Sequence, residues 1–344
     1  MIALLRHLIL ACAFIAIAAC SASGQVQVDP TFDTRVTAPL FPMGSGPVVL
    51  IDEAHHNAHT LNGRYAPFAA LLRSDGFRVE PLRERITMAA LQRAAVVVIA
   101  NAAAADTAPK NNFPVLSAFA PNEIQTLHQW VHAGGSLLLI ADHPPWAGAT
   151  ENLAKSFGVW FSNGYAMRES GKYENIAFRT SDGSLVQHAV TRGRGRSESI
   201  DVVVTFTGQA FRAPTFEPVL RIPDGISIFL PERAGGFSAT TPRIQASGML
   251  QGAVGIYGQG RLAVFGEAAM FSAQLLGPER EPLGMNHPDA AQNKQFVVNV
   301  ARWLVRNGLR PKNRTQLRPH PKPIGAGYAF GEAFCRRRSR LRVS

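Results

Sequence analysis

Side chains of the types that perform acid–base chemistry follow several apolar runs of this sequence. They come directly after the runs that end at Ile51, Ala100, Ala141 and Phe265. The residues concerned are Asp52, His55, Asn57, Asn101, Asp142, His143 and Glu267, and a later Gly-Met-Asn-His-Pro segment adds Asn286 and His287. Polar groups at a buried sheet edge cost free energy unless they bind something, so their convergence predicts a site.

The expected site lies where the strands of an open α/β sheet end, because ligands bind at the carboxyl edge of such sheets. We therefore expect Asp52, Asp142 and Glu267 to line one pocket. Each also has a purely structural interpretation, since carboxylates cap helices and shape turns. His56 and His59 are expected to be exposed rather than to bind a ligand.

Two further histidines have a spacing that can bind metal. His128 and His132 are four residues apart within the helix predicted over 121–133, but no third ligand is near them in sequence. We therefore interpret them as part of a solvated helix face.

Short apolar runs alternate with segments whose apolar residues recur at helical spacing. Strands are predicted over 48–51, 77–80, 95–100, 136–141 and 260–266, and helices over 65–74, 87–93, 121–133, 150–157 and 293–305. This alternation predicts an α/β fold, a flavodoxin-like doubly wound parallel sheet with helices on both faces. Residues 158–258 are different: they consist of short β-like runs separated by Pro and Gly. Residues 103–120 form an Ala/Pro/Asn-rich loop.

The chain divides into four predicted parts. Residues 1–24 are a signal peptide, 25–45 a linker, 46–309 the α/β domain with its β-rich insertion at about 160–258, and 310–344 a basic, disordered tail. The tail carries +9 of the formal charge of +11. The body is thus nearly neutral, and we expect no nucleic-acid partner for it.

The N-terminal segment predicts export. Leu8–Ala19 is an unbroken apolar run of twelve residues, which as a helix rises about 18 Å, too short for a bilayer core of about 30 Å. Ile17-Ala18-Ala19-Cys20 resembles a lipobox, so we expect lipidation at Cys20 and a periplasmic or membrane-anchored lipoprotein. Plain secretion with cleavage near Ala22–Gly24 and a retained membrane anchor stay open as alternatives.

The stretch from Trp130 to Trp146 resembles a known family. Its helix, Gly134-Gly135 turn, apolar strand and Asp142-His143-Pro144-Pro145-Trp146 segment look like the nucleophile elbow of the class I glutamine amidotransferase-like superfamily. The segments 260–267 and 293–304 are similar to uncharacterised bacterial relatives with this fold. The resemblance covers roughly 46–160 and 258–306. It implies that Asp142 stands where the family has a cysteine nucleophile.

The replacement at position 142 has a chemical consequence. A carboxylate is a poor nucleophile toward amides, so glutamine amidotransfer and cysteine-peptidase chemistry are excluded there. We expect an exported protein that binds a small polar or envelope-derived ligand. The alternative is an acid–base or metal-assisted hydrolase using Asp52, His55, Asp142, His143 and Glu267, for which a divalent metal is a possible cofactor. A third hypothesis is an envelope-complex lipoprotein that acts through its surface.

Overall fold

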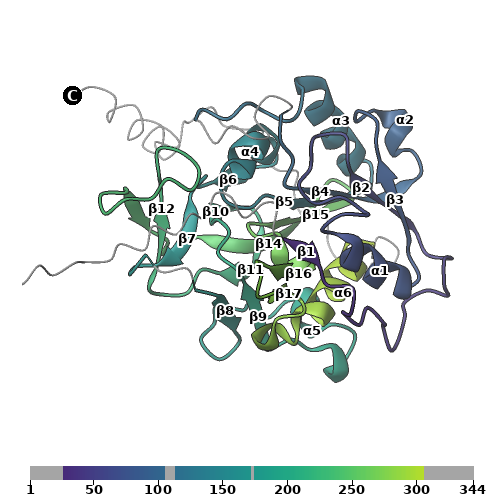
Figure 1. The fold of residues 1–344 in the computed structure, drawn as a ribbon. Helices are drawn as coiled ribbons and strands as arrows, with labels where there is room; N and C mark the ends of the chain where they lie inside the picture. The colour runs from purple at the N-terminus through teal and green to yellow at the C-terminus, as the bar shows by residue number, and fades with distance from the viewer. Residues whose placement is uncertain (1–25, 105–112, 172–173, 306–344) are drawn as a thin grey trace, which may run out of the picture.

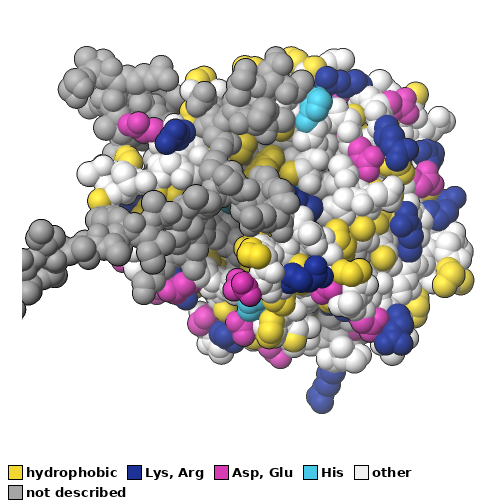
Figure 2. Space-filling view, viewed as in Figure 1, with side chains coloured by type: hydrophobic (Ala, Val, Ile, Leu, Met, Phe, Trp, Pro, Cys, Tyr) yellow, Lys and Arg dark blue, Asp and Glu magenta, His cyan; other side chains and the backbone are white. Residues whose placement is uncertain are grey.

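The computed structural model describes residues 26–104, 113–171 and 174–305 (Figure 1). The predicted signal peptide, Cys20 and the basic tail lie outside these residues. Within them, every helix is too short or too polar to cross a membrane. Figure 2 shows Lys and Arg side chains interspersed with Asp and Glu on the face in view.

Five parallel strands form the central part of the main sheet. They are β2 (Val48–Asp52), β3 (Arg78–Leu82), β4 (Ala94–Ala100), β5 (Ser136–Ile140) and β15 (Gly260–Phe265). Their order across the sheet is β3-β2-β4-β5-β15, and every neighbouring pair is parallel. This is the 2-1-3-4-5 order of flavodoxin-like sheets. The five strands predicted from apolar runs are therefore confirmed, with bounds that differ by at most two residues.

Helices cover both faces of these strands because alternate strand residues point to opposite faces. One face packs on α1 (Ala66–Ser74) and α6 (Asn293–Leu304), and the other on α2 (Met88–Leu91), α3 (Pro121–His132) and α4 (Trp146–Ser156). In β2, Val49 and Ile51 belong to the first core, and Val48 and Leu50 to the second. Helix α4 begins four residues before its predicted start at Thr150.

The predicted insertion is β-rich, but much of it extends the same sheet. β14 (Leu250–Tyr257) pairs antiparallel with β15 and is followed by β10 (Phe211–Arg212) and β6 (Trp160–Phe161), while β11 (Glu217–Arg221) also pairs with β14. A second small sheet contains β7 (Tyr165–Arg168), β12 (Ile226–Phe229) and β13 (Arg243–Gln245), and a two-stranded one contains β8 (Ile176–Arg179) and β9 (Val202–Thr205). The short helix α5 (Ala189–Arg192) lies in the chain between β8 and β9. The fold is thus a mixed α/β one, with more antiparallel pairing than the sequence predicted.

The N-terminal segment over 26–45 packs on the domain and is not a free linker. β1 (Gln27–Val28) pairs with β16 (Ala273–Leu276), which pairs with β17 (Glu281–Gly284). Phe41 meets Phe77 edge-on, with ring centroids 5.3 Å apart. The apolar side chains of this segment bury surface against the core, which offsets the entropy of ordering it.

Candidate functional site

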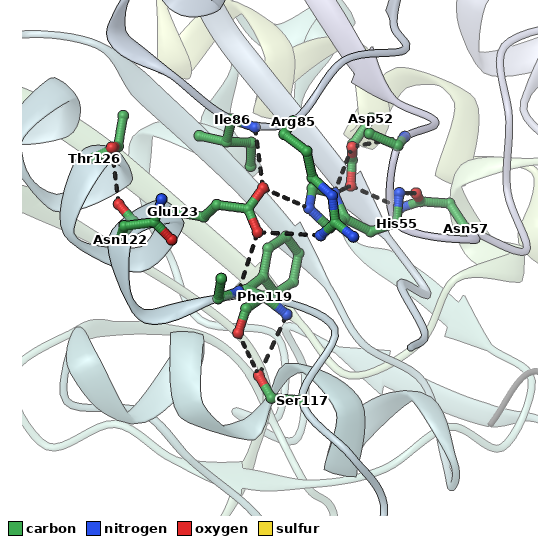
Figure 3. Close-up of polar contacts among 12 residues, drawn as sticks. Asp52, His55, Asn57, Arg85, Ile86, Ser117, Phe119, Asn122, Glu123 and Thr126 are labelled. Carbon is green, nitrogen blue, oxygen red and sulfur yellow. Dashed lines mark hydrogen bonds and ion pairs between the residues drawn. The ribbon is translucent and has the colours of Figure 1, made fainter. Parts of the chain in front are cut away.

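A buried chain of charged groups stands at the carboxyl end of β2 (Figure 3). His55 Nδ1 lies 2.9 Å from both carboxylate oxygens of Asp52, and His55 Nε2 lies 3.0 Å from Glu123 Oε1. All three side chains are almost completely buried. Both ring nitrogens of His55 therefore face carboxylates, which is the arrangement that a protonated imidazole needs.

The turn after β2 fixes the position of the His55 ring. Asp52 Oδ1 accepts a hydrogen bond from the Ala54 N–H, and Asn57 Nδ2 donates to Asp52 Oδ2 at 3.1 Å. The His55 N–H donates to Asn57 Oδ1 at 3.2 Å. Asn57 thus acts through Asp52 and the backbone. Within this turn, His56 has a positive φ of 46°, which is uncommon for a residue other than glycine.

Glu123 is a member of this site that the sequence did not single out. It occupies the third position of α3, and its carboxylate accepts hydrogen bonds from the Ala120 and Ile86 N–H groups at 3.0 and 3.1 Å. Arg85 Nη1 donates to Glu123 Oε2 at 3.2 Å. An acidic residue in the first turn of a helix is the one sequence signal that marks it.

The surroundings of His55 and Glu123 shift the pKa values of these two side chains in opposite directions. Burial lowers the pKa of His55, but the hydrogen bonds and negative charges of Asp52 and Glu123 outweigh it and raise that pKa above its usual value. Burial raises the pKa of Glu123, but the bonds from Ala120, His55 and Ile86 bring it below its usual value. Both shifts favour the charged forms, an imidazolium beside a carboxylate.

A cavity of about 240 Å³ opens next to His55. It is lined by Ala54, His55, His56, Arg85, Ala103, Ala104, Ser117, Ala118, Phe119 and Ala120. Ala54, His55 and His56 follow β2, Arg85 follows β3, and the remaining lining residues follow β4 or precede α3. In the 2-1-3-4-5 order, the chain first places β3 on one side of β2 and then returns to place β4 on the other side. The order of the strands therefore reverses between β2 and β4. The cavity is thus at the point where open α/β sheets bind their ligands.

Asp142 and Glu267 form a separate cluster at the ends of β5 and β15. Asp142 Oδ1 accepts the His143 N–H at 2.7 Å and Oδ2 accepts the Ala268 N–H at 3.4 Å. The two carboxylate oxygens of Glu267 accept the Ala269 and Met270 N–H groups at 2.7 and 2.8 Å. Burial, together with the charge of Asp142, raises the pKa of Glu267 to about 8. Neither carboxylate lines the His55 cavity, so the expected single pocket divides into two clusters.

Asn101 connects the two clusters from the end of β4. Its side-chain oxygen accepts the Asp142 N–H at 2.9 Å, and its carbonyl accepts the Ala58 N–H. Asn101 has a φ of +50°, whereas Asp142 is outside the left-handed region. The strained backbone that defines a nucleophile elbow is therefore not found at Asp142.

His143 is the exposed member of the second cluster. Its ring stacks on Tyr165 at 4.5 Å and lies 5.3 Å from Trp146, with 29% of its side chain exposed. Its Nε2 lies 3.8 Å from Asp142 Oδ1, which is beyond hydrogen-bond distance. His143 is thus held by these ring contacts and by a hydrogen bond from its Nδ1 to the Pro144 carbonyl at 2.9 Å.

Asn286 and His287 are placed elsewhere. Asn286 Nδ2 donates to Asp29 Oδ2 and to the Gln274 carbonyl, so it ties the N-terminal segment to β16. His287 contacts Asn175 and Phe206. Asn175 and Asp289, which flank His287, line a second cavity of about 360 Å³ on the outer side of β8 and β9. The structure therefore gives neither residue a place at the His55 cavity.

Other histidines also differ from expectation. His59 was expected to be exposed but is buried against Tyr65, and burial lowers its pKa to about 3. His128 is bonded through Nδ1 to the Tyr257 hydroxyl and through Nε2 to Ser156 Oγ. His128 therefore has a structural role, while His132 remains exposed on the same helix.

Metal ligands do not converge in the part of the chain that the structure describes. No group of three or more His, Cys, Asp or Glu side chains there has the geometry to hold a metal ion. At His55 both ring nitrogens are already directed at carboxylates. The residues present thus do not fit a divalent metal, and we derive no step through one.

Comparisons with known proteins show similarity in fold. No protein-family model and no curated protein matches the chain. Among solved structures, the mmIFT52 N-terminal domain is 15% identical, with a TM-score of 0.52 over 76% of this chain and 99% of that one. A ThuA-like protein from Bacteroides uniformis is 12% identical, with a TM-score of 0.43 over 80% of this chain and 95% of that one. At these identities the first comparison shows a shared fold and carries no function.

The charge state of His55 gives a first testable prediction. We expect an NMR titration of the full chain to place the His55 midpoint above the usual 6.5, and Asp52→Asn to lower it. Because the pKa is raised on folding, the stabilisation is complete below pH 6.5 and is lost as the pH rises through the folded-state value. A His55 midpoint at or below 6.5 would contradict the proposed ion chain.

Proposed function

We propose that this protein binds a small polar ligand in the cavity beside His55. The observation that carries the proposal is the position of the cavity between the ends of β2 and β4, where the winding of the sheet reverses. Cavities that bind ligands combine mostly apolar walls with a few polar groups that fix orientation. Here alanine and phenylalanine form most of the wall, and His55, His56, Arg85 and Ser117 supply the polar groups.

Binding is favoured over catalysis by the way the candidate groups are used. Asp142 and Glu267 direct their oxygens at backbone N–H groups. His55 directs both ring nitrogens at carboxylates, so neither is available to take a proton from a nucleophile. The buried ion pairs of His55 therefore hold the cavity wall in place and do not supply a general base and a nucleophile.

An acid–base hydrolase remains the second candidate, because of one observation. Glu267 has its pKa raised to about 8 beside the second carboxylate, Asp142, and His143 is partly exposed next to them. A neutral carboxylic acid close to an ionised one is a common arrangement for general acid–base catalysis. Turnover of a hydrolase substrate that Asp142→Asn abolishes would favour this candidate over binding.

The place of action is also part of the proposal. The apolar run Leu8–Ala19, directly before Cys20, supports export, and the ligand would then come from the cell envelope or its surroundings. A lipid anchor at Cys20 would keep the protein at a membrane surface.

Filling the cavity tests the binding proposal. Ala54→Leu places a larger side chain in the His55 cavity, and Ala177→Leu does the same in the second cavity. We expect a library of small polar compounds, tested by ligand-observed NMR, to yield binders that Ala54→Leu weakens by at least about tenfold, or about 1.4 kcal/mol. Ala177→Leu should leave the same binders unaffected. Binders that respond only to Ala177→Leu would refute the proposed location.

A further inference from the structure

The cavity beside His55 has basic residues in its wall and no acidic ones. His55, His56 and Arg85 line it, and the remaining lining residues are Ala, Ser and Phe. This asymmetry is local, because Glu123 and Asp52 lie immediately behind the wall. The charges that a ligand meets therefore depend on which of these side chains line the cavity.

The two carboxylates do not line the cavity, and their oxygens are occupied by other partners. Asp52 is bonded to His55, to Asn57 and to the Ala54 N–H. Glu123 is bonded to His55, to Arg85 and to two backbone N–H groups. Neither is among the lining residues. A ligand thus meets the imidazolium and guanidinium groups and not the carboxylates that balance them.

Arg85 is placed to contact a ligand directly. Its side chain is 65% exposed, and one of its nitrogens, Nη1, is bonded to Glu123. A guanidinium carries five N–H donors in a planar fork that fits carboxylate and phosphate oxygens. The Glu123 contact orients this fork, as Figure 3 shows, while other donors remain to be directed at a ligand.

Two further features border the cavity at the same place. Residues 118–120 lead into the first turn of α3 and line the cavity, so the N-terminus of a twelve-residue helix borders it. His56 also borders it, with the left-handed backbone described above. Strained residues of this kind persist where the surrounding structure fixes them and are frequent at ligand sites.

We propose that the ligand of this cavity carries an oxyanion, a carboxylate or a phosphate, which Arg85 and His56 bind above the His55 ring. This inference deepens the proposed function and rests on it. Hydrogen bonds between ionised groups are stronger than neutral ones, so the charged group is the part of the ligand that sets its orientation.

Matched probes and matched variants test the charge of the ligand. Succinate and inorganic phosphate are compared with the neutral succinamide by titration of the full chain, followed through backbone amide NMR shifts. We expect the anions to shift the amides of residues 103, 104 and 117–120 and succinamide to bind at least about tenfold more weakly. Arg85→Gln should weaken anion binding by about 10- to 100-fold. Arg83→Gln, at an arginine of similar exposure that pairs with Glu53, should not.

The outcomes distinguish the oxyanion inference from the proposal that the His55 cavity binds a small polar ligand. Equal binding of succinate and succinamide in the cavity, or equal effects of Arg85→Gln and Arg83→Gln, would overturn the oxyanion and leave the binding site standing. Anion-induced shifts confined to other residues would also overturn it. Absence of shifts in the cavity with every probe and with the compound library would refute both.

Discussion

Arg302→Met is expected to lower the free energy of unfolding by about 3–5 kcal/mol, the usual loss when one partner of a buried ion pair is removed. The Arg302 guanidinium donates to Asp75 at 2.6 and 2.7 Å and to Glu198 at 2.8 Å, and only 4% of its side chain is exposed. Glu198 keeps Arg194 as a partner in the variant, but Asp75 is left without a cation. Arg302 also bonds the Ala38 carbonyl and thus attaches the N-terminal segment to α6.

Urea unfolding measures this loss, and Arg83→Met is the matched control. Arg83 forms one exposed ion pair with Glu53, and such pairs contribute about 0–1 kcal/mol. Adding Asp75→Asn to Arg302→Met should restore part of the stability, because it removes the buried uncompensated charge. A loss below about 1 kcal/mol for Arg302→Met would show that this network does not stabilise the domain.

His55→Ala is expected to have a similarly large effect, about 3–5 kcal/mol, because it leaves Asp52 and Glu123 buried without the cation between them. The control is His56→Asn at the neighbouring exposed histidine, because asparagine accepts the left-handed backbone there, and we expect a change within about 0.5 kcal/mol. The pair of variants separates the ion chain from the general cost of changing this turn.

The pH dependence of the His55→Ala effect adds a second readout. The wild-type chain should gain most from the ion chain between the unfolded pKa of Glu123 and that of His55, about pH 4.5 to 6.5. Above this window the stabilisation by His55 declines, and below it that of Glu123 declines. Equal losses for the two histidine variants at pH 6 would mean that His55 is not charged and paired in the folded protein.

The central sheet was predictable because its strands are short, apolar and separated by helices. β2 and β5 are buried on both faces, so their sequences, Val48–Asp52 and Ser136–Ile140, are nearly continuous apolar runs. The strands of the insertion are different. β6 and β10 are two residues long and pair antiparallel across distant parts of the chain, so no local periodicity marks their place in the sheet.

The candidate site was predictable only as far as its members are close in sequence. Asp52, His55 and Asn57 lie within six residues and interact in one turn. Glu123 is 68 residues from His55, and the contact exists because α3 begins beside the end of β2. The positions of Asp142 and Glu267 at strand ends also predicted that they lie at the same edge of the sheet. A position at a strand end does not determine which side chains come into contact.

The most direct test of the central claim is a backbone amide NMR titration of the full chain with the small polar compounds that bind it. The account predicts that the shifted amides cluster at residues 54–56, 103–104 and 117–120, around the end of β2 and the start of α3. Shifts that cluster instead at residues 175–179 and 201–204, around the second cavity, would contradict it.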